Sequence, residues 1–264
     1  MTNKPSGQRH LERFPTHVPG LDTILGGGLF AGGVYFVQGA PGVGKTTLAN
    51  QICFRHVASG GRAVYATLLT ESHDRLLQHL RRQSFFAADA IATSLFYVSA
   101  FRHLENAGLK GLVELIQREV TTRQATLLVL DGLMLAVESV DSDRELRLFV
   151  HEVQTLATMI GCTVLLLTSG SRTVPRAEQT MVEGILELED RLVGSRSERQ
   201  IQIRKFRGGR VERGTHAFCI TDDGIEIYPR LESRIDRGGP PVASAGEPLA
   251  TGGPPRSMRD SSRG

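Results

Sequence analysis

The sequence predicts an α/β fold in which a mostly parallel sheet carries helices on both faces and ends in a C-terminal antiparallel meander. Short segments that are apolar throughout alternate with longer segments whose apolar residues repeat at helical spacing. Strands that are apolar on both faces and separated by helices are typical of a parallel sheet covered on each side. After Pro175, strand-like segments follow one another without helices between them, which predicts the meander.

The first half of the chain is expected to begin the parallel sheet. The segment 32–39 is apolar with glycines at both ends, which is typical of a buried strand. Ser72 is suited to cap a helix in which Leu76 and Leu80 share one face. The expected elements are, in order, a strand at 32–39, a helix at 45–58, a strand at 62–70, a helix behind Ser72 and a strand at 94–100.

The second half continues this alternation and then departs from it. Apolar residues from Leu109 to Val120 and from Leu146 to Ile160 form two helical stripes. The later segments keep the alternation of strands but lose the helices. The expected elements are a helix along 109–120, a strand at 126–132, a helix at 142–160, a strand at 162–169 and strands within 184–193, 199–208 and 215–229.

Composition and charge are typical of a soluble globular protein. Hydrophobic residues make up 40% and charged residues 22% of the 264 residues, and the formal net charge is only +3. So slight an excess does not argue for nucleic-acid binding. The three cysteines lie far apart and the histidines show no metal-ligand spacing. Neither a secretory leader nor an apolar run of about 20 residues is visible, so we expect a cytoplasmic protein that enters no membrane.

The chain is expected to form one domain with a flexible segment at each end. Residues 1–12 are polar and are predicted to be a flexible N-terminus, and residues 13–232 form the predicted folded domain. The segment 233–264 is dominated by glycine, proline, serine and arginine and offers almost nothing apolar to pack. Such a composition predicts a disordered tail.

A glycine-rich loop predicts a phosphate-binding site. The run "GAPGVGKTT" matches GxxxxGK[ST], with an apolar strand before it and a helix after it. The glycines let backbone N–H groups close around phosphate oxygens, and the helix N-terminus adds positive potential. Lys45 is expected to reach the β- and γ-phosphates and Thr46 to ligate Mg²⁺. The predicted nucleotide-binding residues are Gly39, Ala40, Pro41, Gly42, Val43, Gly44, Lys45, Thr46 and Thr47.

An aspartate at a strand end is the second part of this predicted site. Asp131 closes "LLVLD", and ligands of open α/β sheets bind at the C-terminal ends of strands. A carboxylate there can hold the metal through water, although an aspartate that only caps a turn is the alternative. The guanine signature (N/T)KxD is absent, because "NKPS" at residues 3–6 lacks the aspartate. We therefore expect ATP, with Mg²⁺, rather than GTP.

The whole pattern resembles the KaiC-like branch of the RecA-type P-loop ATPases. The leader "GLDTILGGGL" feeds the P-loop, "TLLVLDG" falls at the second nucleotide motif, and "RQIQIRKFRGG…GTHAFCITDDGIEIYP" is similar to the C-terminal meander of that family. These three landmarks occur in order over about residues 13–230. The resemblance implies a single-domain RecA-like ATPase that forms a homo-oligomeric ring, taken to be a hexamer, and works with an unidentified protein partner.

Two cations at a predicted strand end pose a separate question. Strand alternation places Ile201, Ile203, Lys205 and Arg207 on one side, so that a core-like face ends in two positive charges. From the alternation alone, an exposed strand end is an equal alternative. The resemblance implies instead that Lys205 and Arg207 act in trans, on the γ-phosphate that a neighbouring subunit binds.

The expected catalytic base shows a departure from the family pattern. The family carries two adjacent glutamates after the second strand, and one of them activates the attacking water. In "LLTESHDRL", Thr70 takes the place of the first glutamate and Glu71 that of the second, after a shift of one residue. Glu71 is the candidate general base. Its alternative is a first-turn glutamate that only favours the helix dipole, in which case hydrolysis is very slow.

Further functions are left open by the sequence. Thr180 lies near the position of phosphoacceptors in the clock member of the family, which makes weak autokinase activity a hypothesis. A RadA-like DNA-binding accessory ATPase is one alternative, although acidic residues dilute its arginine cluster and few aromatic residues are present. An ATP-binding scaffold with little hydrolysis is another, supported by Thr70. The arginines of the cluster are Arg191, Arg196, Arg199, Arg204, Arg210 and Arg213.

Overall fold

A nine-stranded sheet organises the part of the chain that the structure describes. The computed structural model describes residues 12–68, 73–134, 143–169 and 181–231. The predicted flexible N-terminus and disordered tail therefore lie almost entirely outside the described residues. From one edge to the other, the strands are β11 (Gly224–Tyr228), β10 (Thr215–Thr221), β9 (Arg196–Phe206), β8 (Gly184–Val193), β3 (Val34–Gly39), β7 (Thr163–Thr168), β6 (Leu127–Asp131), β4 (Ala63–Thr67) and β5 (Leu95–Ser99).

The directions of these strands confirm a mostly parallel sheet with an antiparallel end. Strands β3, β7, β6, β4 and β5 run parallel, and β8 also pairs with β3 in parallel. The chain then turns back, so that β9, β10 and β11 pair antiparallel in succession. The first strand after Pro175 therefore still belongs to the parallel part of the sheet. The meander proper begins with the hairpin between β8 and β9.

The remaining described elements are short connectors and longer packing helices. None of the described helices combines the length and the apolar character that crossing a membrane requires. A separate two-stranded sheet joins β1 to β2 in the N-terminal leader. These elements are β1 (Arg13–Phe14), α1 (Leu21–Ile24), β2 (Leu29–Phe30), α2 (Lys45–Ala58), α3 (His73–Leu80), the 3₁₀ helix η1 (Ala88–Ala90), α4 (Phe101–Arg123) and α6 (Asp143–Ile160).

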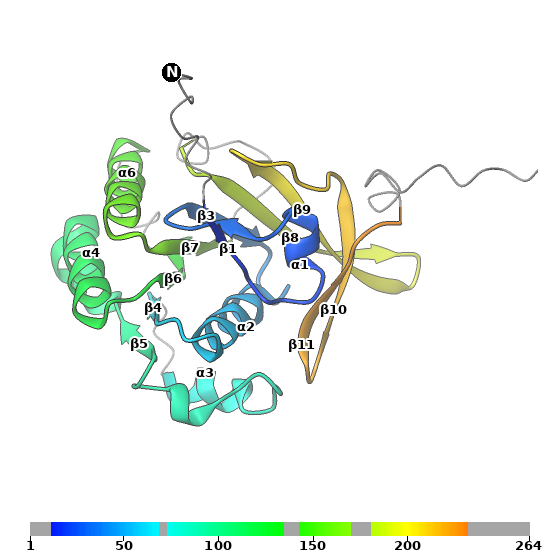
Figure 1. The fold of residues 1–264 in the computed structure, drawn as a ribbon, viewed down its shortest axis with the longest axis horizontal. Coiled ribbons are helices and arrows are strands. Elements are labelled where there is room, and N and C mark those ends of the chain that lie inside the picture. Colours follow the sequence, from blue (N-terminus) through cyan, green and yellow to red (C-terminus); the bar gives the residue numbers. More distant parts are fainter. Residues whose placement is uncertain (1–11, 69–72, 135–142, 170–180, 232–264) are drawn as a thin grey trace, which may run out of the picture.

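Helices cover both faces of the sheet, as Figure 1 shows, with α2 on one side and α4 and α6 on the other. The strands are apolar on both faces for this reason. In β3, Tyr35 and Val37 belong to the core layer that contains α2, whereas Val34 and Phe36 belong to the layer that contains α4 and α6. Two separate apolar layers therefore hold the strand that leads into the P-loop.

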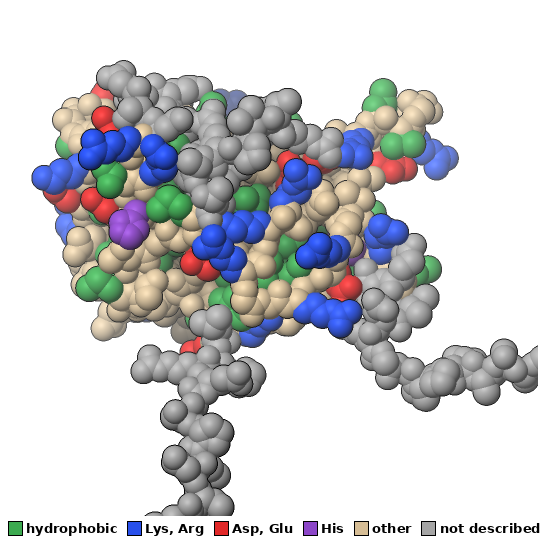
Figure 2. All heavy atoms as spheres, turned by 90° about the horizontal axis from the view of Figure 1, so that it is seen from above, with side chains coloured by type: hydrophobic (Ala, Val, Ile, Leu, Met, Phe, Trp, Pro, Cys, Tyr) green, Lys and Arg blue, Asp and Glu red, His purple; other side chains and the backbone are tan. Residues whose placement is uncertain are grey.

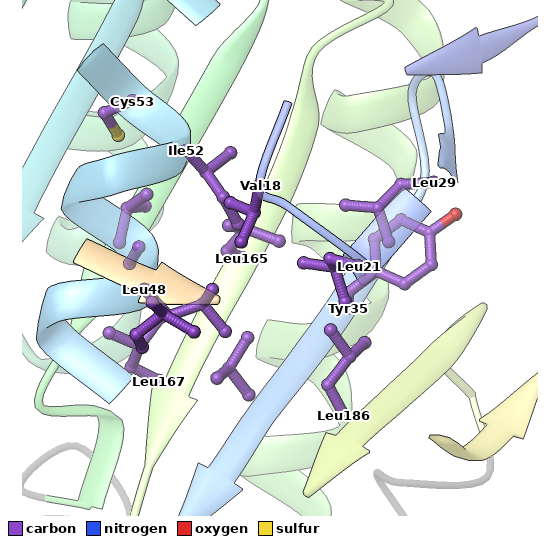
Figure 3. Packing of buried hydrophobic residues seen from close by; sticks show 14 of the residues in the cluster. Val18, Leu21, Leu29, Tyr35, Leu48, Ile52, Cys53, Leu165, Leu167 and Leu186 are labelled. Carbon is purple, nitrogen blue, oxygen red and sulfur yellow. The ribbon is translucent and has the colours of Figure 1, made fainter. Parts of the chain in front are cut away.

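The α2 layer of the core is closely packed. Leu48 and Ile52 of α2 lie over Leu165 and Leu167 of β7, as Figure 3 shows, and each of the four is at most 1% exposed. Burial of a leucine or isoleucine side chain of this kind contributes about 1.5–3 kcal/mol. The helix that follows the P-loop is thereby fixed against the centre of the sheet.

A buried glutamine joins α2 to the far edge of the sheet. Gln51 is fully buried, accepts a hydrogen bond from the backbone N–H of Ile225 at 2.7 Å and donates one to its carbonyl at 3.1 Å. A side chain at Gly224 would collide with this glutamine, since an added Cβ would lie 2.7 Å from its amide. The last strand of the meander is therefore tied to the helix of the P-loop.

The observed bounds follow the predicted ones closely, with one longer helix. The helix at 45–58 is confirmed as α2, and β3 to β7 are shorter than predicted by one to three residues at one or both ends. Strand β8 has the predicted bounds, β9 begins three residues earlier than predicted, and the segment 215–229 forms two strands, β10 and β11. Helix α4 begins at Phe101, eight residues before the stripe that starts at Leu109. Gly108 interrupts it with non-helical dihedral angles (φ 61°, ψ −157°), which explains why the stripe begins only after that residue.

Candidate functional site

The P-loop occupies the turn between β3 and α2. Gly39 ends β3 and Lys45 begins α2, so that the predicted phosphate loop spans the gap between the two elements. Glycine is required at Gly39, because an added Cβ would lie 2.2 Å from the carbonyl oxygen of Leu188. Gly44 precedes the helix with φ 116°, which favours glycine and turns the chain sharply into α2. The loop lies at the N-terminus of a 14-residue helix, where anions are stabilised.

Lys45 folds back over this loop. Its ammonium Nζ donates hydrogen bonds to the carbonyl oxygens of Gly39 at 2.8 Å and Ala40 at 2.9 Å. Burial lowers the pKa of Lys45, and the charge of Asp131 acts in the opposite direction. The cation is therefore held within the loop by carbonyl groups, where a phosphate oxygen can replace them as its partner.

Thr46 and Asp131 are brought together as the sequence predicts. The Thr46 hydroxyl donates to Oδ2 of Asp131 at 2.9 Å, and Asp131 is only 6% exposed at the end of β6. A hydroxyl and a carboxylate are oxygen donors of the kind that Mg²⁺ prefers, and Mg²⁺ needs few protein ligands because it retains several waters. The donor set fits magnesium: Thr46 would be a direct ligand, and Asp131 would hold a coordinated water.

Tyr65 was not predicted to belong to the site. It is fully buried in β4, and its hydroxyl donates to the same Oδ2 of Asp131 at 2.7 Å. Burial, together with the neighbouring charge of Asp131, raises the pKa of Tyr65 well above its usual value, so the phenol stays a donor. One signal in the sequence pointed to it: a tyrosine within the buried run "AVYAT" needs a partner for its hydroxyl.

A second tyrosine supports the other side of Thr46. The Tyr97 hydroxyl donates to Oδ1 of Asn50 at 2.7 Å, and Nδ2 of Asn50 donates to the carbonyl oxygen of Thr46 at 2.8 Å. The rings of Tyr65 and Tyr97 are 5.3 Å apart, centre to centre. Thr46 is thus oriented from both its hydroxyl and its carbonyl, and neither Asn50 nor Tyr97 was predicted.

Two residues of the predicted chemistry lie outside the described part of the chain. Glu71, the candidate base, Thr180, the candidate phosphoacceptor, and Thr70 all lie outside the described residues. The described chain stops before Glu71 at Leu68, whose backbone N–H donates to the carbonyl oxygen of Asp131 at 2.9 Å. The roles of Glu71 and Thr180 stay predictions.

The side of the sheet predicted for Lys205 is wrong, because a β-bulge interrupts β9. Ile203 pairs with Leu186 and Lys205 pairs with Ile185, so that Arg204 is an extra residue with no residue opposite it in the strand pairing with β8. Ile203 belongs to the α2 layer of the core, whereas Ile185 belongs to the α4 and α6 layer. Paired residues share a face, so the bulge moves Lys205 to the face opposite Ile203.

Lys205 and Arg207 nevertheless stay together. The charge of Arg207 helps burial to lower the pKa of Lys205, and Glu183 acts in the opposite direction. The backbone N–H of Arg207 donates to the carbonyl oxygen of Glu183 at 2.7 Å, which holds the chain at the start of β8. The two cations are therefore neighbours on one face, as predicted, although it is not the face of Ile201 and Ile203.

The pair lies away from the P-loop of its own chain. Gly39 pairs with Leu188, which pairs with Ile201, so this part of β9 is level with the P-loop. Lys205 is level with Phe36 and is separated from β3 by β8. At about 3.3 Å per residue, Lys205 is set back about 10 Å from Gly39 along the strands, toward the N-terminal end of β3.

The N-terminal leader holds the end of β9. The Arg13 guanidinium lies over the Phe30 ring at 4.1 Å and over the Phe206 ring at 5.7 Å, and it donates to the Gly28 carbonyl at 2.7 Å. An added Cβ at Gly26 would lie 2.5 Å from the Arg210 carbonyl oxygen. The glycine run of the leader is therefore needed for its close approach to the chain that follows Lys205 and Arg207.

Comparisons with known proteins agree with this architecture. A family model described as "ATPase: KaiC" matches residues 14–232. A UPF0273 protein of Thermotoga maritima is 26% identical over 83% of this chain and 97% of its own length. The circadian clock oscillator protein KaiC of Picosynechococcus is 28% identical over 85% of this chain, which spans only 46% of that protein.

A solved structure shows the same fold. The crystal structure of a KaiC-like protein from Pyrococcus horikoshii matches with a TM-score of 0.71 and 24% identity, over 83% of this chain and all of that one. The sheet order, the P-loop between β3 and α2 and the antiparallel end thus form a RecA-type nucleotide-binding fold. Because the family model extends over nearly all of the described residues, we conclude that the chain belongs to the family of KaiC-like ATPases.

Proposed function

We propose that this protein binds Mg-ATP at its P-loop and hydrolyses the γ-phosphate within a homo-oligomeric ring, in which Lys205 and Arg207 act on the nucleotide of a neighbouring subunit. The contact between Thr46 and Asp131, 2.9 Å from hydroxyl to carboxylate, supports metal and nucleotide binding. The fold and the family match support the ATPase class.

In the proposed reaction, each residue of the site would have a separate role. Lys45 would bind the β- and γ-phosphates, and the backbone N–H groups from Gly39 to Thr47 would surround their oxygens. Bound Mg²⁺ would neutralise charge that develops on the transferred phosphoryl group. Glu71 would take the proton of the attacking water, as the resemblance implies.

The position of Lys205 is the main observation that supports a ring in which the cations act on a neighbouring subunit. The pair is set back from its own P-loop by about 10 Å along the strands and is separated from it by β8. Lys205 and Arg207 therefore cannot reach the phosphates that their own chain binds. A second copy can present its P-loop to them, and cations placed at a transferring phosphoryl group increase rates by about 10³–10⁵-fold.

Exposed positive charge on the face that Figure 2 shows favours an anionic partner surface. Figure 2 shows Lys and Arg side chains spread over the face seen from above, where α6 lies. Arg204 and Arg207 are both exposed, and Lys205 is half-buried. The resemblance implies a hexamer that signals to a protein partner through its nucleotide state. Such a cytoplasmic ATPase is the function that the site supports best.

The test combines oligomer mass with turnover. We would measure light scattering with and without Mg-ATP, and phosphate release, for the wild type and for the Lys205→Ala/Arg207→Ala variant. The expected result is an ATP-dependent ring in the wild type and a collapse of turnover in the variant. A monomer that binds nucleotide and whose slow turnover ignores the substitutions would contradict the proposal and favour the ATP-binding scaffold.

Mixing two inactive variants tests the action in trans directly. The Asp131→Asn variant keeps the cation pair but loses its metal-holding carboxylate, whereas Lys205→Ala/Arg207→Ala keeps an intact P-loop. We expect phosphate release to recover when the two are mixed, because each supplies what the other lacks. No recovery in mixed oligomers would exclude the trans arrangement.

A steeply salt-dependent affinity for single-stranded DNA would favour the RadA-like alternative.

A further inference from the structure

A carboxylate with no role in the chemistry described above is buried beside the P-loop strand. Glu187 lies in β8 and is only 3% exposed. An ionised carboxylate is costly to bury unless a partner compensates its charge. Glu187 pairs in the sheet with Gln38, the residue that immediately precedes Gly39 of the P-loop. Its position is therefore one residue from the nucleotide site.

Glu187 has one partner on each side of its strand. Oε1 accepts a hydrogen bond from Nε2 of Gln38 at 3.1 Å, and Oε2 lies 3.5 Å from Nε of Arg204. The second contact is an ion pair that is too long for a good hydrogen bond, and Oε2 accordingly has no hydrogen-bond partner among the described residues. The side chain of Arg204 is 45% exposed while that of Glu187 is 4% exposed, so the arginine reaches inward to the carboxylate.

Arg204 is also the extra residue of the β-bulge in β9. The register on either side of it pairs Ile203 with Leu186 and Lys205 with Ile185. Without the bulge, strand alternation would return Lys205 to the face of Ile203 and of the α2 core. The residue that Glu187 binds is thus the one that decides on which face Lys205 lies.

We propose that Glu187 is a positioning residue for the cation pair, holding Arg204 so that the bulge keeps Lys205 on the outer face and linking this bulge through Gln38 to the strand that carries the P-loop. The inference rests on the proposed function, because it assumes that Lys205 and Arg207 act on a neighbour. In this arrangement, the nucleotide site of each chain is linked, across β3, β8 and β9, to the Lys205 and Arg207 of the same chain. These two cations would act on the nucleotide of the neighbouring subunit.

The charge of Glu187 is what this role requires. A neutral side chain of the same shape can keep the hydrogen bond to Gln38, but it leaves Arg204 without its counter-charge. The half-exposed guanidinium is then free to turn to solvent, and the bulge loses the contact that distinguishes its register. We expect Lys205 to be misplaced while the fold and the P-loop persist.

The experiment compares Glu187→Gln with Glu189→Gln as its matched control. Glu189 is two residues further along the same strand, and its carboxylate pairs with Arg191 at 2.7 Å instead of Arg204. For Glu187→Gln we expect kcat to fall about ten- to hundredfold, the effect of misplacing a catalytic group by about 1 Å. We expect KM for ATP, nucleotide affinity and oligomer mass to stay at wild-type values, and Glu189→Gln to leave kcat unchanged. A rise in KM for ATP, a loss of nucleotide affinity, or a fall of kcat in Glu189→Gln as well would indicate a general structural role and overturn the proposal.

A double-mutant cycle separates positioning from direct action. If Glu187 acts through Arg204, then Arg204→Gln and the double variant should each lose about as much kcat as Glu187→Gln alone, because both substitutions break the same link. Additive losses would overturn the proposal. So would a loss in Arg204→Gln without one in Glu187→Gln, since Arg204 would then act by itself.

Failure of this inference can be told apart from failure of the ring. The mixing experiment with Asp131→Asn and Lys205→Ala/Arg207→Ala reports on trans action without touching Glu187. Recovery in that mixture with full activity of Glu187→Gln would leave the ring intact and reject the positioning role. No recovery would reject the ring, and the positioning role would fall with it.

Discussion

At the scale of single residues, the nucleotide site is built by hydrogen bonds that converge on one carboxylate. Oδ2 of Asp131 accepts from the Thr46 hydroxyl at 2.9 Å and from the Tyr65 hydroxyl at 2.7 Å. The two donors come from α2 and β4, while the acceptor comes from β6. Thr46 would turn to a bound metal, but Tyr65 would keep the carboxylate in place. Tyr65 is thus a residue that positions Asp131 rather than one that binds the metal.

We expect Tyr65→Phe to weaken Mg²⁺ binding. Removal of the hydroxyl leaves the 6%-exposed Asp131 with one donor fewer, and loss of a partner that orients a metal-holding group costs about 10- to 100-fold in affinity. The free energy of unfolding should fall by about 1–3 kcal/mol. Mg²⁺ titration of ATP binding and urea unfolding measure the two effects.

Tyr97→Phe is the matched control for this prediction. It removes an equally short hydrogen bond, 2.7 Å to Asn50, but touches no carboxylate. Because Asn50 links Tyr97 to the backbone carbonyl of Thr46 and not to the Asp131 carboxylate, we expect Tyr97→Phe to lower stability while shifting the Mg²⁺ titration much less than Tyr65→Phe does. Equal shifts of Mg²⁺ affinity in the two variants would contradict a specific role for Tyr65.

At the scale of elements, the P-loop helix α2 is anchored at both ends. Its first turn carries Lys45 and Thr46, and Gln51 in its middle binds Ile225 of β11. Near its C-terminus, His56 lies against Phe14 of the leader, with ring centres 4.7 Å apart, and its Nε2 contacts the Thr126 hydroxyl at 2.8 Å. The leader, α2 and β6 therefore meet around one imidazole.

We expect His56 to make the protein less stable in mild acid. Burial, aided by the neighbouring His17, lowers the pKa of His56 from 6.5 to about 4. The unfolded chain therefore binds this proton first, and stability is present above about pH 6.5 and is lost as the pH falls toward 4. Urea unfolding at pH 7, 6 and 5 should show a falling midpoint.

His56→Gln identifies the contribution of this one group. The amide can still reach Thr126 but does not titrate, so the variant should lose less stability than the wild type between pH 7 and 5. His73 and His216 also have pKa values that burial lowers, and they supply a slope common to both proteins. Identical slopes would show that His56 does not carry the effect.

At the scale of the whole molecule, the P-loop and the cation pair lie at different places on one sheet. The P-loop, where the nucleotide is proposed to bind, follows the C-terminal end of the central strand β3, while Lys205 of β9 is level with Phe36, nearer the N-terminal end of β3. The leader and the meander meet at Arg13, Phe30 and Phe206, close to the cation pair. In the proposed ring, this one sheet would hold both the nucleotide site and the cations that act on the neighbouring subunit.

We expect Mg-ATP to stabilise the folded chain through Lys45. A ligand that binds only the native state adds about 2.7 kcal/mol to the free energy of unfolding at 100 times its Kd. The melting temperature should therefore rise with Mg-ATP, rise less with ATP and EDTA, and stay constant in Lys45→Ala. Lys205→Ala/Arg207→Ala should keep the binding-dependent rise. A rise that survives in Lys45→Ala would place the nucleotide elsewhere.

Much of this molecule could be predicted from sequence because the relevant signals are local. The P-loop is a contiguous run in which Gly42 and Gly44 take positive φ values that favour glycine, and α2 begins and ends at the predicted residues. Asp131 was found because it closes a strand that is apolar on both faces. The order of strands and helices follows from hydrophobic periodicity, and the parallel sheet follows from that order.

The partners across strands could not be predicted in this way. The bulge at Arg204 exists only in the pairing of β9 with β8, and a strand read by itself alternates without interruption, so Lys205 was placed on the wrong face. Tyr65 meets Asp131, and Glu187 meets Gln38 and Arg204, only because the sheet brings distant segments together. The sequence by itself determined the fold class, the phosphate loop and the aspartate at the end of β6 that lies beside it. The tertiary structure alone decided which way the cations face and which buried groups hold them, because register is a property of two strands and not of one.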